Sequence, residues 1–251
     1  MIQLCRADER RHSERRQQEV WFTFHPQHQT GQLADGFGSL SFLSEYRLRP
    51  GASVAPHPRN ESEIVSYVRE GSFECSKSSA PSTVTHAGDF LRMPLGHGTL
   101  YSEANPSRSH SAHVFQLGLQ PSKEGTARAA EHKHFTTAQR RNVLCVVASL
   151  DGRKGSLGVG QDILIFSSIL ERGHHFAYDL PLGRSAWLHI VQGEGALGEI
   201  DLITGDGVGI TAERAVSFTA HEDTEILLVD VGEIGPERSL ARTSLDRIKA
   251  N

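Results

Sequence analysis

Short apolar runs that alternate with polar residues, separated by turn residues, limit most strongly what this chain can fold into. Residues 63–68, 111–117 and 186–191 alternate in this way or carry β-branched residues. Clusters of Gly, Pro, Asn, Asp and Ser separate such runs at intervals of roughly 8–15 residues, the spacing of antiparallel sandwiches and barrels. The polar segments 6–19 and 236–251 look like terminal arms with at most one short helix. The sequence therefore predicts an all-β protein.

The chain also repeats itself. A glycine turn at Gly71 is followed by a Gly-Asp turn at residues 88–89, and the same order recurs at Gly193 and residues 205–206. Gly supplies the positive φ of such turns, and Asp can hydrogen-bond the neighbouring backbone. We expect two duplicated units, divided within the polar stretch 121–139. The predicted segments are an N-terminal domain of residues 1–130, a linker of 131–135, a C-terminal domain of 136–232 and a tail of 233–251.

Composition excludes several classes of protein. The 26 Lys and Arg residues against 30 Asp and Glu residues give a net charge of −4, which provides no basic field for nucleic acid. No apolar run approaches the roughly 20 residues that span a bilayer, and the N-terminus has no secretory pattern. The three cysteines, Cys5, Cys75 and Cys145, lie far apart, as suits a reducing compartment. We expect a cytoplasmic protein without a nucleic-acid or membrane partner, and the sequence identifies no protein partner.

Two segments carry the candidate chemistry, residues 56–71 and residues 88–103. The first begins Pro-His-Pro-Arg and ends Tyr-Val-Arg-Glu-Gly, and the second begins Gly-Asp, contains Gly-His-Gly and ends Tyr-Ser-Glu. Together they resemble the two halves of a cupin metal motif, and more narrowly that of the pirin family. The resemblance implies a bicupin of two antiparallel β-barrels, each a double-stranded β-helix or jelly roll. The chain is similar to the bacterial pirin-like proteins, some of which are quercetin 2,3-dioxygenases.

The resemblance also implies a metal site, which this chain keeps only in part. Family members hold a divalent metal on three His and one Glu, and His57 and Glu103 match two of these positions. Arg59 and Tyr101 stand at the other two. Strand alternation places 57 with 59, and 101 with 103, on one face. Arginine has no lone pair to donate to a metal, so we expect no cofactor. The alternative is one divalent ion of Fe, Mn, Cu or Ni on His57 and Glu103.

Three arrangements of this pocket remain open. The Arg59 guanidinium fills the metal volume and pairs with Glu103, with Tyr101 hydrogen-bonded to either; or Arg59 points into solvent; or His97 supplies a ligand from its glycine turn. An arginine in a cavity of low dielectric constant favours a small anionic or phenolic molecule. The predicted pocket consists of His57, Arg59, His97, Tyr101 and Glu103.

Three functions follow from these alternatives. The first is a pirin-like protein that has lost metal-dependent dioxygenase activity and acts as a small-ligand-binding or regulatory protein. The second is a metal-dependent quercetin 2,3-dioxygenase. The third is a thiol-based redox or stress sensor, for which Cys75, expected to be partly exposed, is the candidate. His113 is expected to be a satisfied core or pocket-wall histidine, and the histidines of residues 132–134 are expected in an exposed loop.

Overall fold

The computed structural model describes residues 1–15, 17–24, 33, 35–59, 63–77, 81–95, 99–120 and 129–232, with only the backbone of Pro58 and Arg59. Over these ranges almost all regular structure is β. The exceptions are the 3-10 turns η1 (Ala7–Glu9) and η2 (Arg153–Gly155) and the short helix α1 (Thr137–Arg140). The prediction of an all-β protein is confirmed.

The first half of the chain forms two facing sheets. The seven-stranded sheet has the order β12-β9-β6-β11-β4-β3-β2, and the four-stranded sheet has the order β5-β10-β7-β8. The strands are β2 (Arg11–Arg15), β3 (Gln18–Phe24), β4 (Leu40–Leu48), β5 (Ser53–Arg59), β6 (Glu63–Glu70), β7 (Ser72–Lys77), β8 (Thr83–His86), β9 (Asp89–Pro94), β10 (Thr99–Ala104), β11 (Ala112–Leu119) and β12 (Glu131–His134).

The second half repeats the pattern. Its seven-stranded sheet has the order β1-β20-β17-β22-β15-β13-β14, and its four-stranded sheet has the order β16-β21-β18-β19. The first strand of the chain, β1, pairs with β20 and so belongs to this sheet. The strands are β1 (Ile2–Cys5), β13 (Cys145–Ser149), β14 (Leu157–Gly158), β15 (Ile163–Leu170), β16 (His175–Asp179), β17 (Ser185–Gln192), β18 (Glu194–Leu197), β19 (Ile200–Ile203), β20 (Gly207–Thr211), β21 (Ala215–Ala220) and β22 (Thr224–Val231).

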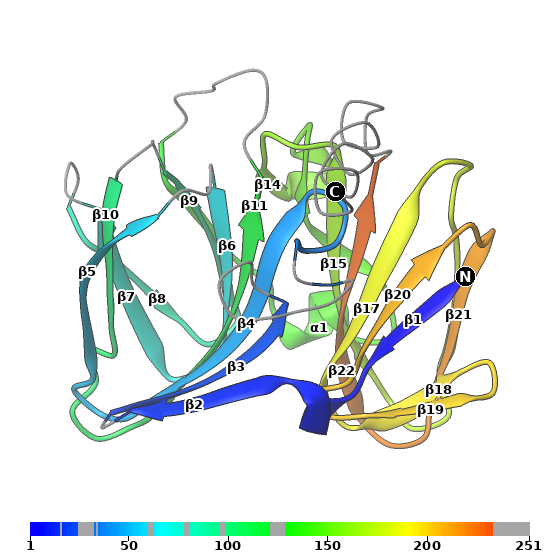
Figure 1. The fold of residues 1–251 in the computed structure, drawn as a ribbon, viewed down its shortest axis with the longest axis horizontal. Coiled ribbons are helices and arrows are strands. Elements are labelled where there is room, and N and C mark those ends of the chain that lie inside the picture. Colours follow the sequence, from blue (N-terminus) through cyan, green and yellow to red (C-terminus); the bar gives the residue numbers. More distant parts are fainter. Residues whose placement is uncertain are drawn as a thin grey trace, which may run out of the picture.

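The sheets form four layers, with the two large sheets packed face to face and the small sheets outside (Figure 1). One apolar cluster, which includes Phe115, Trp187 and Val229, lies between the large sheets, and each half encloses a core of its own. The central strands β11 and β22 are buried almost throughout because both of their faces are covered. Each half is a jelly-roll sandwich, the expected bicupin architecture, although its sheets stay open rather than closing into a barrel.

The repeated turns have the same local structure in both halves. Gly71 and Gly193 have φ of 76° and 93°, and an added Cβ would lie within 2.6 Å of a backbone oxygen at either position. The carboxylates of Asp89 and Asp206 each accept a hydrogen bond from the backbone N–H three residues upstream, at 2.8 and 3.1 Å. The sequence repeat thus corresponds to matching turns, with glycine and aspartate in the roles expected of them.

A buried ionic cluster joins the two halves. Glu225 of β22 accepts hydrogen bonds from Arg140 Nη1 at 2.9 Å, from Arg69 Nε at 3.2 Å and from the Tyr67 hydroxyl. Arg140 and Glu225 side chains are 5% and 11% exposed, so the pair is largely removed from water. Such a cluster fixes the contact between the halves, because removing one partner leaves a buried charge uncompensated.

Two segments that the sequence assigned to irregular structure are strands instead. Residues 6–19 are not a terminal arm: they form η1, β2 and the start of β3. The residues assigned to a linker include β12, which pairs with β9; its histidines are exposed as expected, but they lie on a strand. Both β2 and β12 are edge strands with polar side chains, so they carry no apolar alternation. The predicted tail, residues 233–251, lies outside the described residues.

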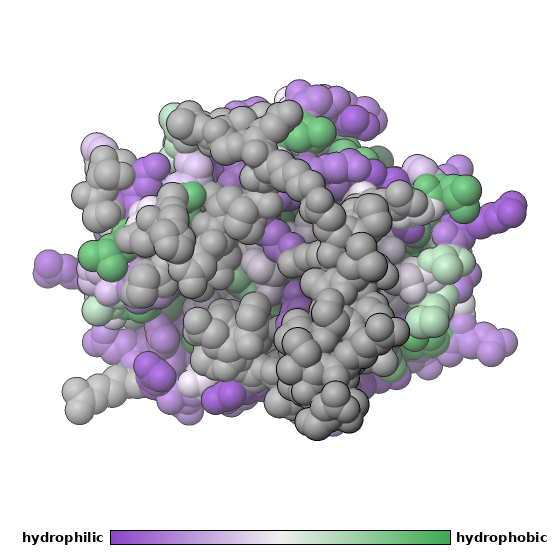
Figure 2. Space-filling view, turned by 45° about the horizontal axis from the view of Figure 1, so that its top comes forward, coloured by the Kyte–Doolittle hydropathy of each residue, from purple (hydrophilic) through white to green (hydrophobic). Residues whose placement is uncertain are grey.

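The surface mixes residue types. Figure 2 shows hydrophilic and hydrophobic residues interspersed over the coloured part of one face. Among the described residues, no helix is long and apolar enough to cross a membrane.

Candidate functional site

A row of polar side chains crosses the inner face of the first large sheet. Ser44 of β4, Gln116 of β11 and Ser66 of β6 are direct cross-strand neighbours, and all three are inaccessible to solvent. We call these three residues the polar belt. The flanking inward positions on the same strands are apolar, for example Val114 and Ile64. The belt is therefore a polar patch inside an otherwise hydrophobic core.

Two side chains of β10 face the belt from the small sheet. Gln116 Nε2 lies 2.7 Å from Glu103 Oε1 and 3.3 Å from both Tyr101 Oη and Ser66 Oγ. Tyr101 and Glu103 are 0% and 3% exposed, which confirms that they share the inward face, even though the register of β10 against β5 shifts between them. The amide must present its NH₂ to Glu103, because a carboxylate only accepts hydrogen bonds.

Two atoms of the belt have unused hydrogen-bonding capacity. Gln116 Oε1 and Ser44 Oγ are buried and have no partner among the residues that the structure describes. Most buried polar atoms are hydrogen-bonded, and leaving one unsatisfied costs roughly 1–3 kcal/mol. Gln116 Oε1 belongs to the amide whose Nε2 contacts Glu103, and Ser44 is the direct cross-strand neighbour of Gln116 on β4. The site can therefore accept hydrogen bonds from a bound molecule that carries hydroxyl groups.

The second half provides an internal control for the belt. Ser66 lies five residues before the turn at Gly71, and Leu188 lies five residues before the matching turn. Gln116 pairs with Ser66, and Leu228 pairs with Leu188 in the same way. Both leucines belong to the apolar core of the second sandwich. Because the second sandwich forms with leucine at these positions, the fold itself does not require the polar belt.

The structure brings together three of the five predicted pocket residues. His57 on β5 is half-buried and lies directly across from Tyr101, with ring centroids 6.2 Å apart and an interplanar angle of 81°. The third is Glu103, which shares the inward face with Tyr101. The side chain of Arg59 and the whole of His97 lie outside the described residues. The three arrangements expected for these two side chains stay predictions.

Sequence reasoning missed the polar belt. The available signal was a polar residue at an inward position of an apolar strand: glutamine follows Val114 and serine follows Ile64 at a spacing of two. That signal becomes specific only when the strands are paired. The register places Ser44, Gln116 and Ser66 at one level, although they come from three separate parts of the chain.

The expected partial exposure of Cys75 is wrong. Its side chain is 1% exposed on the inner face of β7, across from Glu103. Burial raises the pKa of Cys75 to about 12, and it likewise raises the pKa of Cys5 to about 11. Burial also raises the pKa of Cys145, although less of its surface is covered. Because the thiolate is the reactive form, Cys75 is not positioned as a redox sensor.

His113 is a buried histidine held through one ring nitrogen, close to the core or pocket-wall histidine that the sequence predicts. It is 6% exposed, and its Nε2 lies 2.7 Å from Glu45 Oε1. Arg10 Nη1 donates to the other oxygen of Glu45 at 2.8 Å. Burial alone would raise the pKa of Glu45, but the hydrogen bond from His113 and the charge of Arg10 lower it to about 2. The carboxylate therefore stays ionised between its two partners.

The donor set does not fit the metal that the family resemblance implies. Tyr101 replaces one imidazole ligand, and Arg59 offers no lone pair at another ligand position. Glu103 Oε1 already accepts a hydrogen bond from Gln116. Over the described ranges, the structure contains no group of three or more His, Cys, Asp or Glu residues that could hold a metal ion.

Known proteins resemble both halves of the chain. A model of the Pirin family matches residues 5–119, and a model described as "Quercetinase C-terminal cupin domain" matches residues 146–231. The quercetin 2,3-dioxygenase of Escherichia coli K12 is 30% identical over 92% of this chain and 99% of its own length. A pirin-like protein of Caulobacter vibrioides is 28% identical over 77% of this chain and 84% of its own length.

Solved structures show the same extent of similarity. The crystal structure of YhhW from E. coli matches with a TM-score of 0.84 at 30% identity, covering 93% of this chain and 98% of that one. A structure of that bacterial pirin in complex with nickel(II) matches with a TM-score of 0.85, also at 30% identity, over 93% of this chain and 100% of that one. The similarity therefore covers both sandwiches and nearly the whole length of these relatives.

Proposed function

Because the chain belongs to the pirin family but has Arg59 and Tyr101 at two of that family's metal-ligand positions, we propose that its first sandwich binds a small phenolic molecule without a metal. In this proposal the protein has lost metal-dependent dioxygenase activity and acts by binding. The observation that carries the proposal is a pair of buried acceptors without partners among the described residues, Gln116 Oε1 and Ser44 Oγ, together with the contact of the Gln116 amide with the Glu103 carboxylate.

Each residue of the site has a distinct task in this account. The Glu103 carboxylate accepts the hydrogen bond of a phenol O–H, an interaction roughly twice as strong as a neutral one because the acceptor is ionised. Gln116 holds that carboxylate in place through Nε2 and offers Oε1 to a second hydroxyl. His57 and Tyr101 contribute aromatic surface from neighbouring strands of the small sheet. Arg59 extends the site to phenolates or other small anions through its charge.

The test is calorimetric titration of quercetin and of benzoate into protein treated with EDTA. We expect one quercetin per chain, bound at least tenfold more weakly by Gln116→Leu, a difference of about 1.4 kcal/mol. The control Gln192→Leu, at an exposed position of β17, should leave the affinity unchanged. Arg59→Ala should weaken benzoate more than quercetin. Failure of quercetin to bind without metal, or equal affinity in Gln116→Leu, contradicts the proposal.

A metal-dependent quercetin 2,3-dioxygenase is the second candidate. It is favoured by the names of the relatives and by the nickel(II) complex of the E. coli protein. Oxygen uptake on addition of quercetin to nickel-loaded protein would support this activity and would overturn the metal-free account.

The proposed setting is the cytoplasm, with no nucleic-acid or membrane partner. The net charge of −4 and the three free cysteines support this setting. Fractionation of cells that express the tagged chain tests it, and recovery in the membrane pellet would contradict it.

A further inference from the structure

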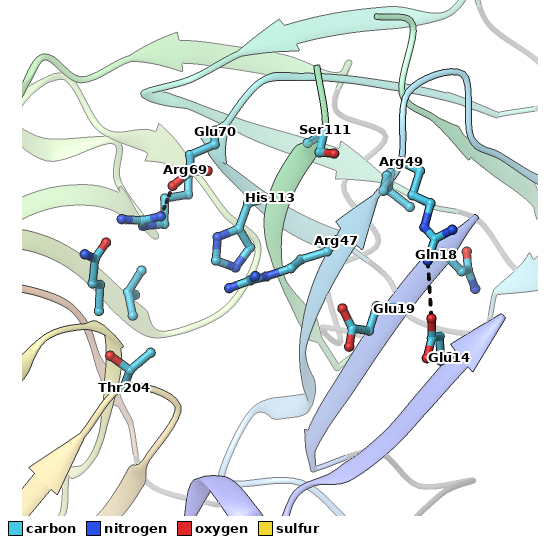
Figure 3. Close-up of a pocket in the computed structure, with 14 residues that line it drawn as sticks. Glu14, Gln18, Glu19, Arg47, Arg49, Arg69, Glu70, Ser111, His113 and Thr204 are labelled. Atoms are coloured by element: carbon cyan, nitrogen blue, oxygen red, sulfur yellow. Dashed lines mark hydrogen bonds and ion pairs between the residues drawn. The ribbon is translucent and has the colours of Figure 1, made fainter. Parts of the chain in front are cut away.

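A groove of about 540 Å³ lies between the two halves, outside the first sandwich. One wall consists of residues from β2, β3, β4, β6 and β11 of the first half, and the other includes Val191, Gln192 and Thr204 of the second half (Figure 3). The polar belt faces the interior of the first sandwich, whereas this groove opens on the side of the large sheet that faces the second half. The groove is therefore separate from the site described above.

Charged side chains line the groove in a row across four adjacent strands. The register sets Glu19 next to Arg47, Arg47 next to His113, and His113 next to Glu70. Every carboxylate that lines the groove has a basic partner close by. The pairs are Glu14 with Arg49 at 3.4 Å, Glu19 with His12 at 3.0 Å, and Glu70 with Arg69. Glu14 and Glu70 are therefore paired with arginines, whereas the partner of Glu19 is a histidine.

Arg47 differs from the other arginines of the groove. Within the described part of the chain it forms no ion pair with a carboxylate, and its guanidinium carbon lies 5.6 Å from the centre of the Trp21 ring. Stacking on an aromatic ring restrains a guanidinium while its N–H edge stays available for a planar anion. Arg47 thus carries a positive charge that no ion pair within the described residues holds, although Glu19 is its cross-strand neighbour.

His113 lies beside Arg47 and presents a second unused polar atom (Figure 3). Its Nε2 is held by Glu45, whereas its Nδ1 has no hydrogen-bond partner among the residues described. In the imidazolium form both ring nitrogens donate, so Nδ1 can donate to a ligand while Nε2 stays on Glu45. An anionic group that meets Arg47 can therefore also accept a hydrogen bond from the imidazolium form of His113.

We propose that this groove binds a small organic anion whose carboxylate or phosphate group contacts Arg47 and His113 Nδ1. The exposed amide of Gln192 on the opposite wall provides a neutral polar contact for the rest of the molecule, so the ligand bridges the two halves. The paired carboxylates along the same wall disfavour a polyanion such as nucleic acid, which would bring many charges close to them. The ligand is therefore small, with a single anionic end.

The test is calorimetric titration of the full chain with citrate and with inorganic phosphate at low ionic strength. We expect one anion per chain and at least a tenfold loss of affinity in Arg47→Gln, with a smaller loss in Arg47→Lys, which keeps the charge but not the planar fork. Arg172→Gln removes the same charge from an exposed position outside the groove and should leave the affinity unchanged. The anion that binds more tightly distinguishes a carboxylate ligand from a phosphate ligand.

Two further outcomes make the test decisive. Gln116→Leu should leave the anion affinity unchanged, because the polar belt is a separate site, so failure of the phenol-binding proposal does not affect this one. Backbone amide shifts on anion addition should centre on Arg47, His113 and Gln192. Absence of binding by the wild-type chain, equal weakening in Arg172→Gln, or shifts centred elsewhere would overturn the proposal.

Discussion

Replacing Gln116 with leucine gives the first sandwich the residue that the second carries at the same position, Leu228. The change removes the 2.7 Å hydrogen bond to Glu103 and leaves a carboxylate that is 3% exposed without its donor. Leaving a buried polar group without a hydrogen-bond partner lowers the free energy of unfolding by about 1–3 kcal/mol. The single variant Glu103→Leu has a similar cost, because it leaves the Gln116 amide without its closest acceptor. Replacing both partners with apolar residues removes both penalties, which is often neutral or stabilising.

The expected result is a strong coupling between the two substitutions. Each single variant should lose about 1–3 kcal/mol of unfolding free energy, and the double variant Glu103→Leu/Gln116→Leu should match the wild type to within about 1 kcal/mol. Urea denaturation at neutral pH, with unchanged slopes, measures all four free energies. If the losses of the single variants add in the double variant to within about 0.5 kcal/mol, the belt and Glu103 do not act as a unit. A stable double variant that no longer binds quercetin would show that the polar belt is retained for binding.

Three further predictions concern stability, acid sensitivity and thiol reactivity. Arg140→Met should lower the unfolding free energy by about 3 kcal/mol, because it removes one partner of the buried Glu225 carboxylate. The shift of the urea midpoint measures this loss, and a loss under about 1 kcal/mol contradicts the prediction. Burial opposes ionisation of Glu45, but its hydrogen-bonded partners lower its pKa from 4.5 to about 2, so its stabilising effect is complete above pH 4.5 and disappears as the pH falls toward 2. Glu45→Gln should therefore flatten the decline of the melting temperature across that window, and an unchanged acid profile would refute the assignment. In the native protein, Ellman's reagent should modify Cys145 before Cys75, whose pKa burial raises to about 12; equal rates measured by mass spectrometry would show that Cys75 is accessible.

Sequence periodicity was sufficient to predict the strands that lie against a hydrophobic core. The strands β6, β11 and β17 have the apolar or alternating patterns that predicted them, because burial selects those side chains. The edge strands β2 and β12 were missed because they are held by backbone hydrogen bonds and present polar side chains, and a polar strand has no signal that separates it from a loop.

A difference between local patterns and contacts from distant parts of the chain explains how much of the site was predictable. Alternation placed Tyr101 and Glu103 on one inward face, since that relation is local along a strand. The contact of Glu103 with Gln116 depends on how two sheets face each other, which no local pattern encodes. The burial of Cys75 depends in the same way on β7 having its inner face against the first core, although its spacing of two from Phe73 was visible.

The most direct measurement of the central claim is a calorimetric titration with nickel(II) of the wild-type chain and of Arg59→His/Tyr101→His. The double substitution gives the site three histidines and one glutamate, the ligand set of metal-binding pirins. We predict that the double variant binds one nickel ion per chain, while the wild type and the control Arg172→Gln bind none at the same micromolar concentrations. Binding of one nickel ion per chain by the wild type, lost in Glu103→Gln, would contradict the account.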